Sequence, residues 1–334
     1  MPKLTAMDEF FVHQIPEPLP NVVTWHDHWR ESLFFICHHP TERRDALILT
    51  MAHYPKRETM DSIQMGRIGG EHFIGHHARG YDGDPHTFEV GPVKIDVIEP
   101  YEELHLQVDG SEAVIGMDLT FTARSAPNAY RRGTMKYRHE IVWDQSHMIQ
   151  SGTFNGTYSK DGRTYEVENW WGQRDHSWGI RDHGRCPLWI WLAIQLPDAM
   201  LAVWHWEYPN GARVYTDGCY APTDKSEPTP VIDFRHDLEW VDHDGKPTAY
   251  GTDADGVAGI RGHVEFVLED GRTIGVDAEG IWARSYRPFA HGGLNEVSVR
   301  TDDGRTGTAI YEVTGSHHHR YFPDTVVEHL PPGP

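Results

Sequence analysis

The stretch Gly262–Ala283, GHVEFVLEDGRTIGVDAEGIWA, consists of two runs of alternating apolar and polar residues joined by Asp270-Gly271. A period of two places apolar side chains on one face of a β-strand, and Asp-Gly between two such runs favours a tight hairpin turn. No stretch of the sequence shows a sustained helical period with caps. We therefore predict an all-β protein built from consecutive antiparallel hairpins. Similar turn dipeptides occur at Asp82-Gly83, Asp109-Gly110, Asp161-Gly162, Asn210-Gly211, Asp244-Gly245 and Asp303-Gly304.

Three short matches recur in the same order in the two halves of the chain, which indicates an internal repeat. The matched pairs are DALILTMAHYP from Asp45 with DAMLAVWHWEYP from Asp198, TARSAP around Arg124 with WARSYRP around Arg284, and DGRT from Asp161 with DGRT from Asp303. The repeat predicts two similar β domains, residues 1–168 and 169–334. Closure into barrels would remove exposed sheet edges and leave room for a small ligand; two β-sandwiches without a cavity are the alternative.

Charge and cysteine content exclude several classes of protein. The net charge of −20 over 334 residues argues against nucleic-acid partners and anionic membranes. The three cysteines are widely spaced and form no Cys-x-x-Cys, so neither a zinc ribbon nor a disulfide scaffold is expected. The first twenty residues lack the uninterrupted apolar segment of a signal peptide, so none is expected there, and no apolar run is long enough to span a membrane. We expect a cytoplasmic protein without membrane insertion.

The segment Pro187–Tyr208, PLWIWLAIQLPDAMLAVWHWEY, predicts a hairpin that is apolar on both faces. Trp189 and Trp191 share one face of its first strand, and Trp204 and Trp206 share one face of the second. Leucine and isoleucine occupy the opposite face of the first strand and would form a domain core. The tryptophan face could line a chamber for an apolar ligand or pack against the other domain. By the same alternation, His205 is expected to be a hydrogen-bonded core histidine.

The stretch Val167–Gly184, VENWWGQRDHSWGIRDHG, combines tryptophans with arginine, aspartate and histidine. Buried charges require partners, so these side chains should form a network. In the catalytic interpretation Asp175 orients His176, which transfers a proton, and Arg174 binds a substrate oxygen. In the structural interpretation the same network joins the two domains. The substrate-binding candidates in and next to this stretch are Trp170, Trp171, Gln173 and Trp178.

A metal site is a further alternative. His26 and His28 share a strand face in WHDHW and are followed by Glu31, which is a possible ligand set. Adjacent histidines elsewhere point to opposite strand faces and would chelate poorly. The sequence contains no phosphate-binding loop, dinucleotide fingerprint or nucleophile elbow. We therefore expect no cofactor.

The motif GQRDHSWG, Gly172–Gly179, resembles that of two-domain lipocalin-like proteins, which include hydroxyneurosporene synthase (carotenoid 1,2-hydratase) and the fungal lipocalin-like Diels–Alderases. Their motif runs Tyr-His-Asp-His-Asn-Trp-Gly, and Asp175, His176, Trp178 and Gly179 match it. Gln173-Arg174 replaces Tyr-His, and serine replaces asparagine. The resemblance implies two consecutive lipocalin-like (calycin) β-barrels that act on isoprenoid or polyketide-like molecules by hydration, cyclisation or isomerisation, without metal or nucleotide.

These observations together predict a cofactor-independent lyase, isomerase or cyclase acting on a small hydrophobic molecule. The ligand would lie in a tryptophan-lined chamber at or near the domain junction, and the Arg174 substitution suggests a substrate with one polar end. A carrier that binds such a ligand without converting it is the first alternative. A metal-dependent oxygenase using His26, His28 and Glu31 is the second. The sequence does not determine the oligomeric state.

Overall fold

The computed structural model describes residues 4–13, 26–41, 45–137, 139–182, 185, 188–208, 210–249, 256–284 and 291–315. Within these ranges the fold is all-β, apart from two short 3-10 turns, η1 (Ala6–Glu9) and η2 (Pro55–Arg57). The registers of the paired strands are antiparallel, as the alternating runs and turn dipeptides predict. No helix in the described ranges is long and apolar enough to cross a membrane.

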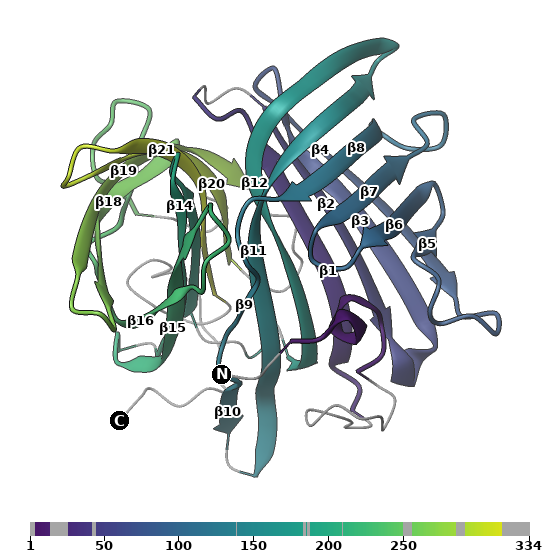
Figure 1. Ribbon diagram of the computed structural model, residues 1–334, viewed down its shortest axis with the longest axis horizontal. Coiled ribbons are helices and arrows are strands. Elements are labelled where there is room, and N and C mark those ends of the chain that lie inside the picture. Colours follow the sequence, from purple (N-terminus) through teal and green to yellow (C-terminus); the bar gives the residue numbers. More distant parts are fainter. Residues whose placement is uncertain are drawn as a thin grey trace. The chain divides into compact units, whose positions relative to one another are not determined.

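The strands form two sheets (Figure 1). The first contains β1 (Trp29–His38), β2 (Ala46–Tyr54), β3 (Thr59–Ile68), β4 (Glu71–Gly80), β5 (Glu89–Val90), β6 (Val93–Glu99), β7 (Glu103–Val108), β8 (Gly116–Ala123), β9 (Asn128–Ala129), β10 (Gly133–Tyr137), β11 (Glu140–Lys160) and β12 (Arg163–Arg181). The second contains β13 (Leu188–Gln195), β14 (Ala199–Glu207), β15 (Arg213–Pro222), β16 (Thr229–His236), β17 (Glu239–Val241), β18 (Gly259–Leu268), β19 (Thr273–Arg284), β20 (His291–Thr301) and β21 (Thr306–Gly315).

The first sheet is a nearly closed barrel with the strand order β4-β3-β2-β1-β12-β11-β8-β7-β6-β5, ten strands in the described ranges. Its two end strands approach each other, and the Arg79 guanidinium on β4 donates to the main-chain oxygen of Glu89 on β5 at 2.7 Å. The inward side chains form one apolar core, which includes Leu33, Phe35 and Phe121.

The second sheet closes completely. β13 to β16 follow one another, β18 to β21 continue the meander, β21 pairs with β13, and β16 pairs with β18. Eight strands of the described chain thus form the barrel, and β17 adds to it by pairing with β18. Closure leaves no exposed edge among these eight strands, as a two-barrel fold requires. The interior is filled by an apolar core to which β13 contributes Leu188, Ile190, Leu192 and Ile194.

The chain divides into two compact units, one of residues 1–40, 44–132 and 144–181 and the other of 41–43, 133–143 and 182–334. The boundary expected from the repeat, between residues 168 and 169, falls inside β12. Because β12 pairs with β1 from Trp29↔Ile180 to His38↔Trp171, the whole strand is part of the first barrel. Residues 133–143, from the β10–β11 hairpin, belong with the second unit.

The three sequence matches fall on equivalent strands of the two barrels. Asp45 and Asp198 immediately precede β2 and β14, the second strands of their barrels. Arg124 directly follows β8 and Arg284 ends β19; in chain order each of these strands is third from last among the strands that form its barrel. The two DGRT sequences form the last hairpin turns, between β11 and β12 and between β20 and β21. The short matches therefore occupy corresponding places in two similar barrels.

Candidate active site

The side chains of β12 alternate between the inside and the outside of the first barrel. Leu33 and Phe35, which are in the core, lie opposite His176 and Arg174 in the β1–β12 register. Side chains directly opposite each other in an antiparallel pair share a face. The sequence candidates therefore separate into an inward set of Trp170, Arg174, His176 and Trp178 and an outward set of Trp171, Gln173 and Asp175.

The carboxylate of Glu31 on β1 lies among three imidazoles inside the first barrel. Its Oε1 contacts Nδ1 of His13 and lies 2.9 Å from Nε2 of His176. Its Oε2 lies 3.3 Å from Nε2 of His53 on β2. The four side chains are at most 3% exposed, so water does not screen this cluster.

Two of the three imidazoles are also held on their far side. Asp8 Oδ1 lies 3.0 Å from Nε2 of His13, and the Tyr81 hydroxyl lies 3.0 Å from Nδ1 of His53. Neither ring nitrogen of His176 makes a well-aligned hydrogen bond within the described residues; Nε2 lies 2.9 Å from Glu31 Oε1, whereas the buried far nitrogen, Nδ1, has no such polar neighbour. His176 is thus the imidazole whose second nitrogen is left for chemistry.

The charges of the cluster are coupled. Burial alone would lower the pKa of His13, but the Glu31 and Asp8 carboxylates outweigh it and raise that pKa to about 9. Burial would likewise raise the pKa of Glu31, yet the charge of His13 and the hydrogen bonds of the imidazoles hold it well below its usual range. Near neutral pH the cluster therefore contains a histidinium–carboxylate pair beside His176.

Arg174 is fully buried, and its guanidinium is hydrogen-bonded to other side chains of the protein. Both of its terminal nitrogens donate to the Glu9 carboxylate, with Nη2 to Oε2 at 2.7 Å, and its Nε donates to Gln150 Oε1 at 3.0 Å. The main-chain N–H of Tyr101 also donates to Glu9, at 2.8 Å. Arg174 would be able to bind a substrate oxygen, as the sequence predicts, only after Glu9 moved away.

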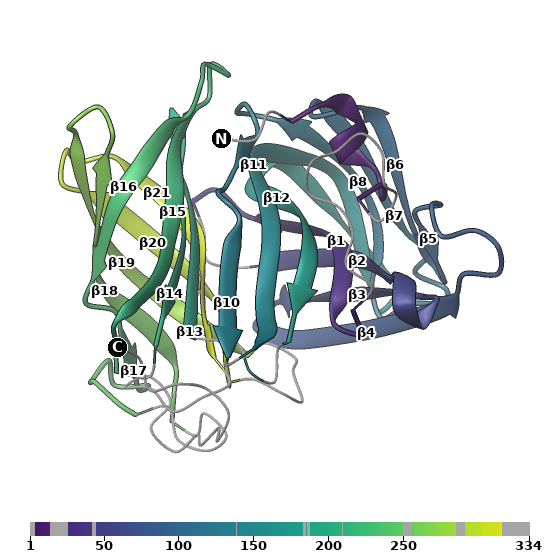
Figure 2. The same ribbon diagram turned by 90° about the horizontal axis from the view of Figure 1, so that it is seen from below.

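The segment Leu4–His13 thus closes the interior beside the cluster. Phe11 stacks on His53 with ring centroids 4.7 Å apart, and His13 stacks on Trp178 at 3.6 Å. Figure 2 shows its 3-10 turn η1 at one end of the first barrel, near β7 and β8. A ligand approaching His176 from this side would have to displace Phe11 and His13.

The structure does not bring Asp175 to His176, because neighbours on a strand point to opposite faces. Asp175 Oδ2 lies 3.5 Å from Nε2 of His147. Gln173 is buried on the same outward face, and Trp171 lies under the Arg124 guanidinium at 4.5 Å. Glu31, and not Asp175, is the carboxylate beside His176.

The four tryptophans of the β13–β14 hairpin belong to the second unit. Trp189 lies opposite Trp206, and Trp191 lies opposite Trp204, on the face away from the barrel core. Trp143 packs on this face, with centroid distances of 5.7 Å to Trp189 and 5.4 Å to Trp206. The rings are at most 8% exposed. That they line a ligand chamber stays a prediction.

Two clusters of metal-ligating side chains occur in the described residues, and neither is the set expected from the sequence. His26 accepts a hydrogen bond from the main chain of His28 at 3.1 Å, while Glu31 lies in the His13–His176 cluster. The ligand atoms of His13, Glu31 and His176 lie within 4.8 Å of one another, so they could also hold a cation. The second cluster consists of His205, Glu207 and His236.

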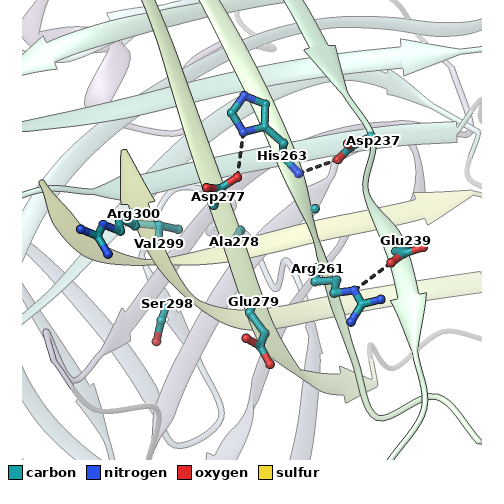
Figure 3. Close-up of a pocket in the computed structure, with 11 residues that line it drawn as sticks. Asp237, Glu239, Arg261, His263, Asp277, Ala278, Glu279, Ser298, Val299 and Arg300 are labelled. Atoms are coloured by element: carbon teal, nitrogen blue, oxygen red, sulfur yellow. Dashed lines mark hydrogen bonds and ion pairs between the residues drawn. The ribbon is translucent and has the colours of Figure 1, made fainter. Parts of the chain in front are cut away.

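A surface depression on the second barrel offers less chemistry (Figure 3). It lies over the outward faces of β17 to β20. His263 Nδ1 lies 2.8 Å from Asp277 Oδ1, and Arg261 donates to Glu239 at 2.7 Å. These charged groups satisfy one another, so we place the candidate active site in the first barrel.

Sequence reasoning missed Glu9, His13 and His53. The MAHYP repeat contains His53, and strand alternation places it on the face of Met51, so a search for polar residues on core faces would have found it. No local pattern marks Glu9 or His13, because their partners Arg174 and Glu31 are 165 and 18 positions away.

Comparison with known proteins agrees with the two-barrel fold. The structure is similar to the AttH-like protein NE1406 of Nitrosomonas europaea, with a TM-score of 0.60, 10% identity and coverage of 87% of this chain and 94% of that one. It is also similar to kievitone hydratase from Nectria haematococca, with a TM-score of 0.54, 13% identity and coverage of 95% and 94%. At these identities the likeness concerns the fold, and it confirms the lipocalin-like two-barrel architecture.

Sequence comparison gives the family. No curated protein matches the chain in sequence. Residues 4–251, which include every residue of the Glu31 cluster, match the family described as "Family of unknown function (DUF8625)". The chain therefore belongs to this family and has the lipocalin-like two-barrel fold.

Proposed function

We propose that the protein is a hydratase-like lyase or isomerase that acts on a small hydrophobic molecule inside the first barrel. The observation that carries this proposal is the arrangement of His176, a buried imidazole with Glu31 beside Nε2 and with Nδ1 unpartnered among the described residues. A carboxylate on one nitrogen fixes the tautomer and leaves the other nitrogen to accept or donate a proton. The fold shared with a hydratase supports the same reaction class.

The roles follow from the contacts. With Nε2 protonated toward Glu31, Nδ1 of His176 can take a proton from water or from substrate, and Glu31 then stabilises the imidazolium. The rings of Trp178 and His176 form a T-shaped pair with centroids 5.5 Å apart, so Trp178 would supply an apolar wall beside the imidazole. Arg174 would hold the segment Leu4–His13 in place through Glu9, and displacement of that segment would admit the substrate.

Isotope incorporation tests this proposal. The protein is incubated in D₂O and in H₂¹⁸O with terpenoids, sterols, polyketides, aromatic acids and kievitone, and the recovered molecules are analysed by mass spectrometry. A hydratase transfers solvent deuterium to carbon and solvent oxygen to the product, whereas an isomerase transfers deuterium only. His176→Gln should abolish incorporation. His147→Gln, a buried histidine on the outward face, is the matched control and should retain it.

The outcomes distinguish the alternatives. Ligands that quench tryptophan fluorescence yet return without isotope would identify a carrier. Equal turnover by His176→Gln and the native protein would remove His176 from the mechanism. If His176→Gln lost its native circular dichroism, His176→Asn and ligand affinity measured separately from turnover would decide between a catalytic and a structural role.

A further inference from the structure

A second histidine–glutamate cluster lies inside the second barrel, on strands that the proposed reaction does not use. His205 and Glu207 are two positions apart on β14 and therefore share a face, the one that carries Leu201 and Val203 into the core. His236 ends β16, the second strand along from β14, since β15 lies between them. Two strands, β14 and β16, thus hold two imidazoles and one carboxylate at one place in the barrel.

The ligand atoms have the separations that a single metal ion requires. Glu207 Oε1 lies 3.2 Å from Nε2 of His205 and 2.8 Å from Nε2 of His236. All three atoms are within 4.8 Å of one another. A first-row divalent ion with bonds of about 2.1 Å holds neighbouring ligand atoms about 3 Å apart. Small side-chain rotations would therefore suffice to admit an ion.

The second ring nitrogen of His205 is also in a polar contact, as is usual for metal-binding histidines. Its Nδ1 lies 2.6 Å from Oγ1 of Thr216, which is directly opposite on β15. When Nε2 binds a cation, the proton moves to Nδ1 and donates to this hydroxyl. Such outer contacts fix the tautomer and the ring direction of a ligand.

The surroundings favour a neutral imidazole. His205 and Glu207 are buried, and Phe234 packs against the rings of both histidines, with centroids 5.4 Å and 5.6 Å away. Such an apolar surrounding suits neutral imidazole, which together with carboxylate is the form that binds metal.

We propose that His205, Glu207 and His236 form a binding site for a divalent transition-metal ion in the second barrel. Two histidines and one carboxylate leave open coordination positions for water or another ligand, a ligand set suited to zinc or iron(II). The site is separate from the His176 chemistry, so either proposal can hold without the other.

Titration of the full chain tests the site. The protein, purified without a polyhistidine tag and stripped with EDTA, is titrated with Zn²⁺ by calorimetry and with Co²⁺ by visible absorption. We expect saturable binding, a rise in melting temperature with Zn²⁺, and Co²⁺ d–d bands typical of mixed nitrogen and oxygen ligation. Thr216→Val, which keeps all three ligands, should weaken the affinity about 10- to 100-fold.

Variants locate the ion. Glu207→Gln and His236→Ala should lose the tight equivalent and the Co²⁺ bands, whereas His263→Ala, a histidine paired with Asp277 on the outer surface, should retain both. Glu31→Gln tests the other cluster and should leave this equivalent in place. Absence of saturable Zn²⁺ and Co²⁺ binding by the native protein would overturn the proposal, as would an unchanged number of tightly bound equivalents in folded Glu207→Gln.

Discussion

Glu9 and Arg174 form a bidentate ion pair inside the first barrel, with both side chains fully buried. The contact joins residues 165 positions apart and fixes the segment Leu4–His13 against β12. Burial would raise the pKa of Glu9, but the Arg174 charge holds it lower than usual, so the pair remains ionised. The side chain that the sequence assigns to substrate binding is thus neutralised by the chain itself.

Removing one partner of this pair should be more harmful than removing both. Glu9→Gln leaves a buried guanidinium without its counter-charge and should cost about 3–5 kcal/mol of unfolding free energy. The double variant Glu9→Gln/Arg174→Met removes the charge as well and should recover part of that loss. Urea unfolding of the native protein, both single variants and the double variant gives the coupling energy. If the losses of unfolding free energy in the two single variants simply added up in the double variant, the pair would not hold the segment.

The His176 tautomer should depend on Glu31 and not on Asp175. Nitrogen-15 chemical shifts of His176 report which ring nitrogen carries the proton. We expect Nε2 protonated in the native protein and in Asp175→Asn, because Asp175 points to the other strand face, and a mixture of tautomers in Glu31→Gln. Turnover should fall about 10²- to 10⁴-fold in Glu31→Gln and change little in Asp175→Asn. If the tautomer changed in Asp175→Asn and not in Glu31→Gln, Asp175 would be the residue that orients His176, as the sequence predicts.

The difference between Asp175 and Glu31 shows what the sequence could predict. Period-two runs and Asp-Gly turns are local, so they predicted the all-β class, and the three matches indicated equivalent strands such as β2 and β14. His176 was found through its motif, but its partner depends on barrel closure, which pairs β12 with β1 across the chain. Strand alternation alone could have excluded Asp175, since adjacent side chains of a strand cannot share a face.

The first barrel should lose stability as pH rises from about 6.5 to 9. The pKa of His13 is about 9 in the folded protein against 6.5 ordinarily, so the folded state holds a proton that the unfolded state releases in this range. The stabilisation is complete below pH 6.5 and disappears as pH passes 9, with a change on the order of 3 kcal/mol. Denaturant midpoints measured every half pH unit should show this slope in the native protein and lose it in His13→Gln. Equal slopes would exclude His13 as the source.

Trp143 should be a principal packing residue of the second unit. It is 2% exposed and lies within 6.3 Å of the rings of Trp189, Trp204 and Trp206. Trp143→Ala would open a cavity against these rings and should cost about 3–5 kcal/mol, whereas Trp143→Phe should cost less because an aromatic ring still covers the face. Trp171→Ala, a partly buried tryptophan of the first barrel, is the control for loss of an indole. Thermal unfolding followed by tryptophan fluorescence measures all three.

The contradicting outcome would be a Trp143→Ala variant that is no more destabilised than Trp171→Ala. The tryptophan face would then not depend on Trp143 for its burial, and ligand binding to that face would be the better explanation for its four rings.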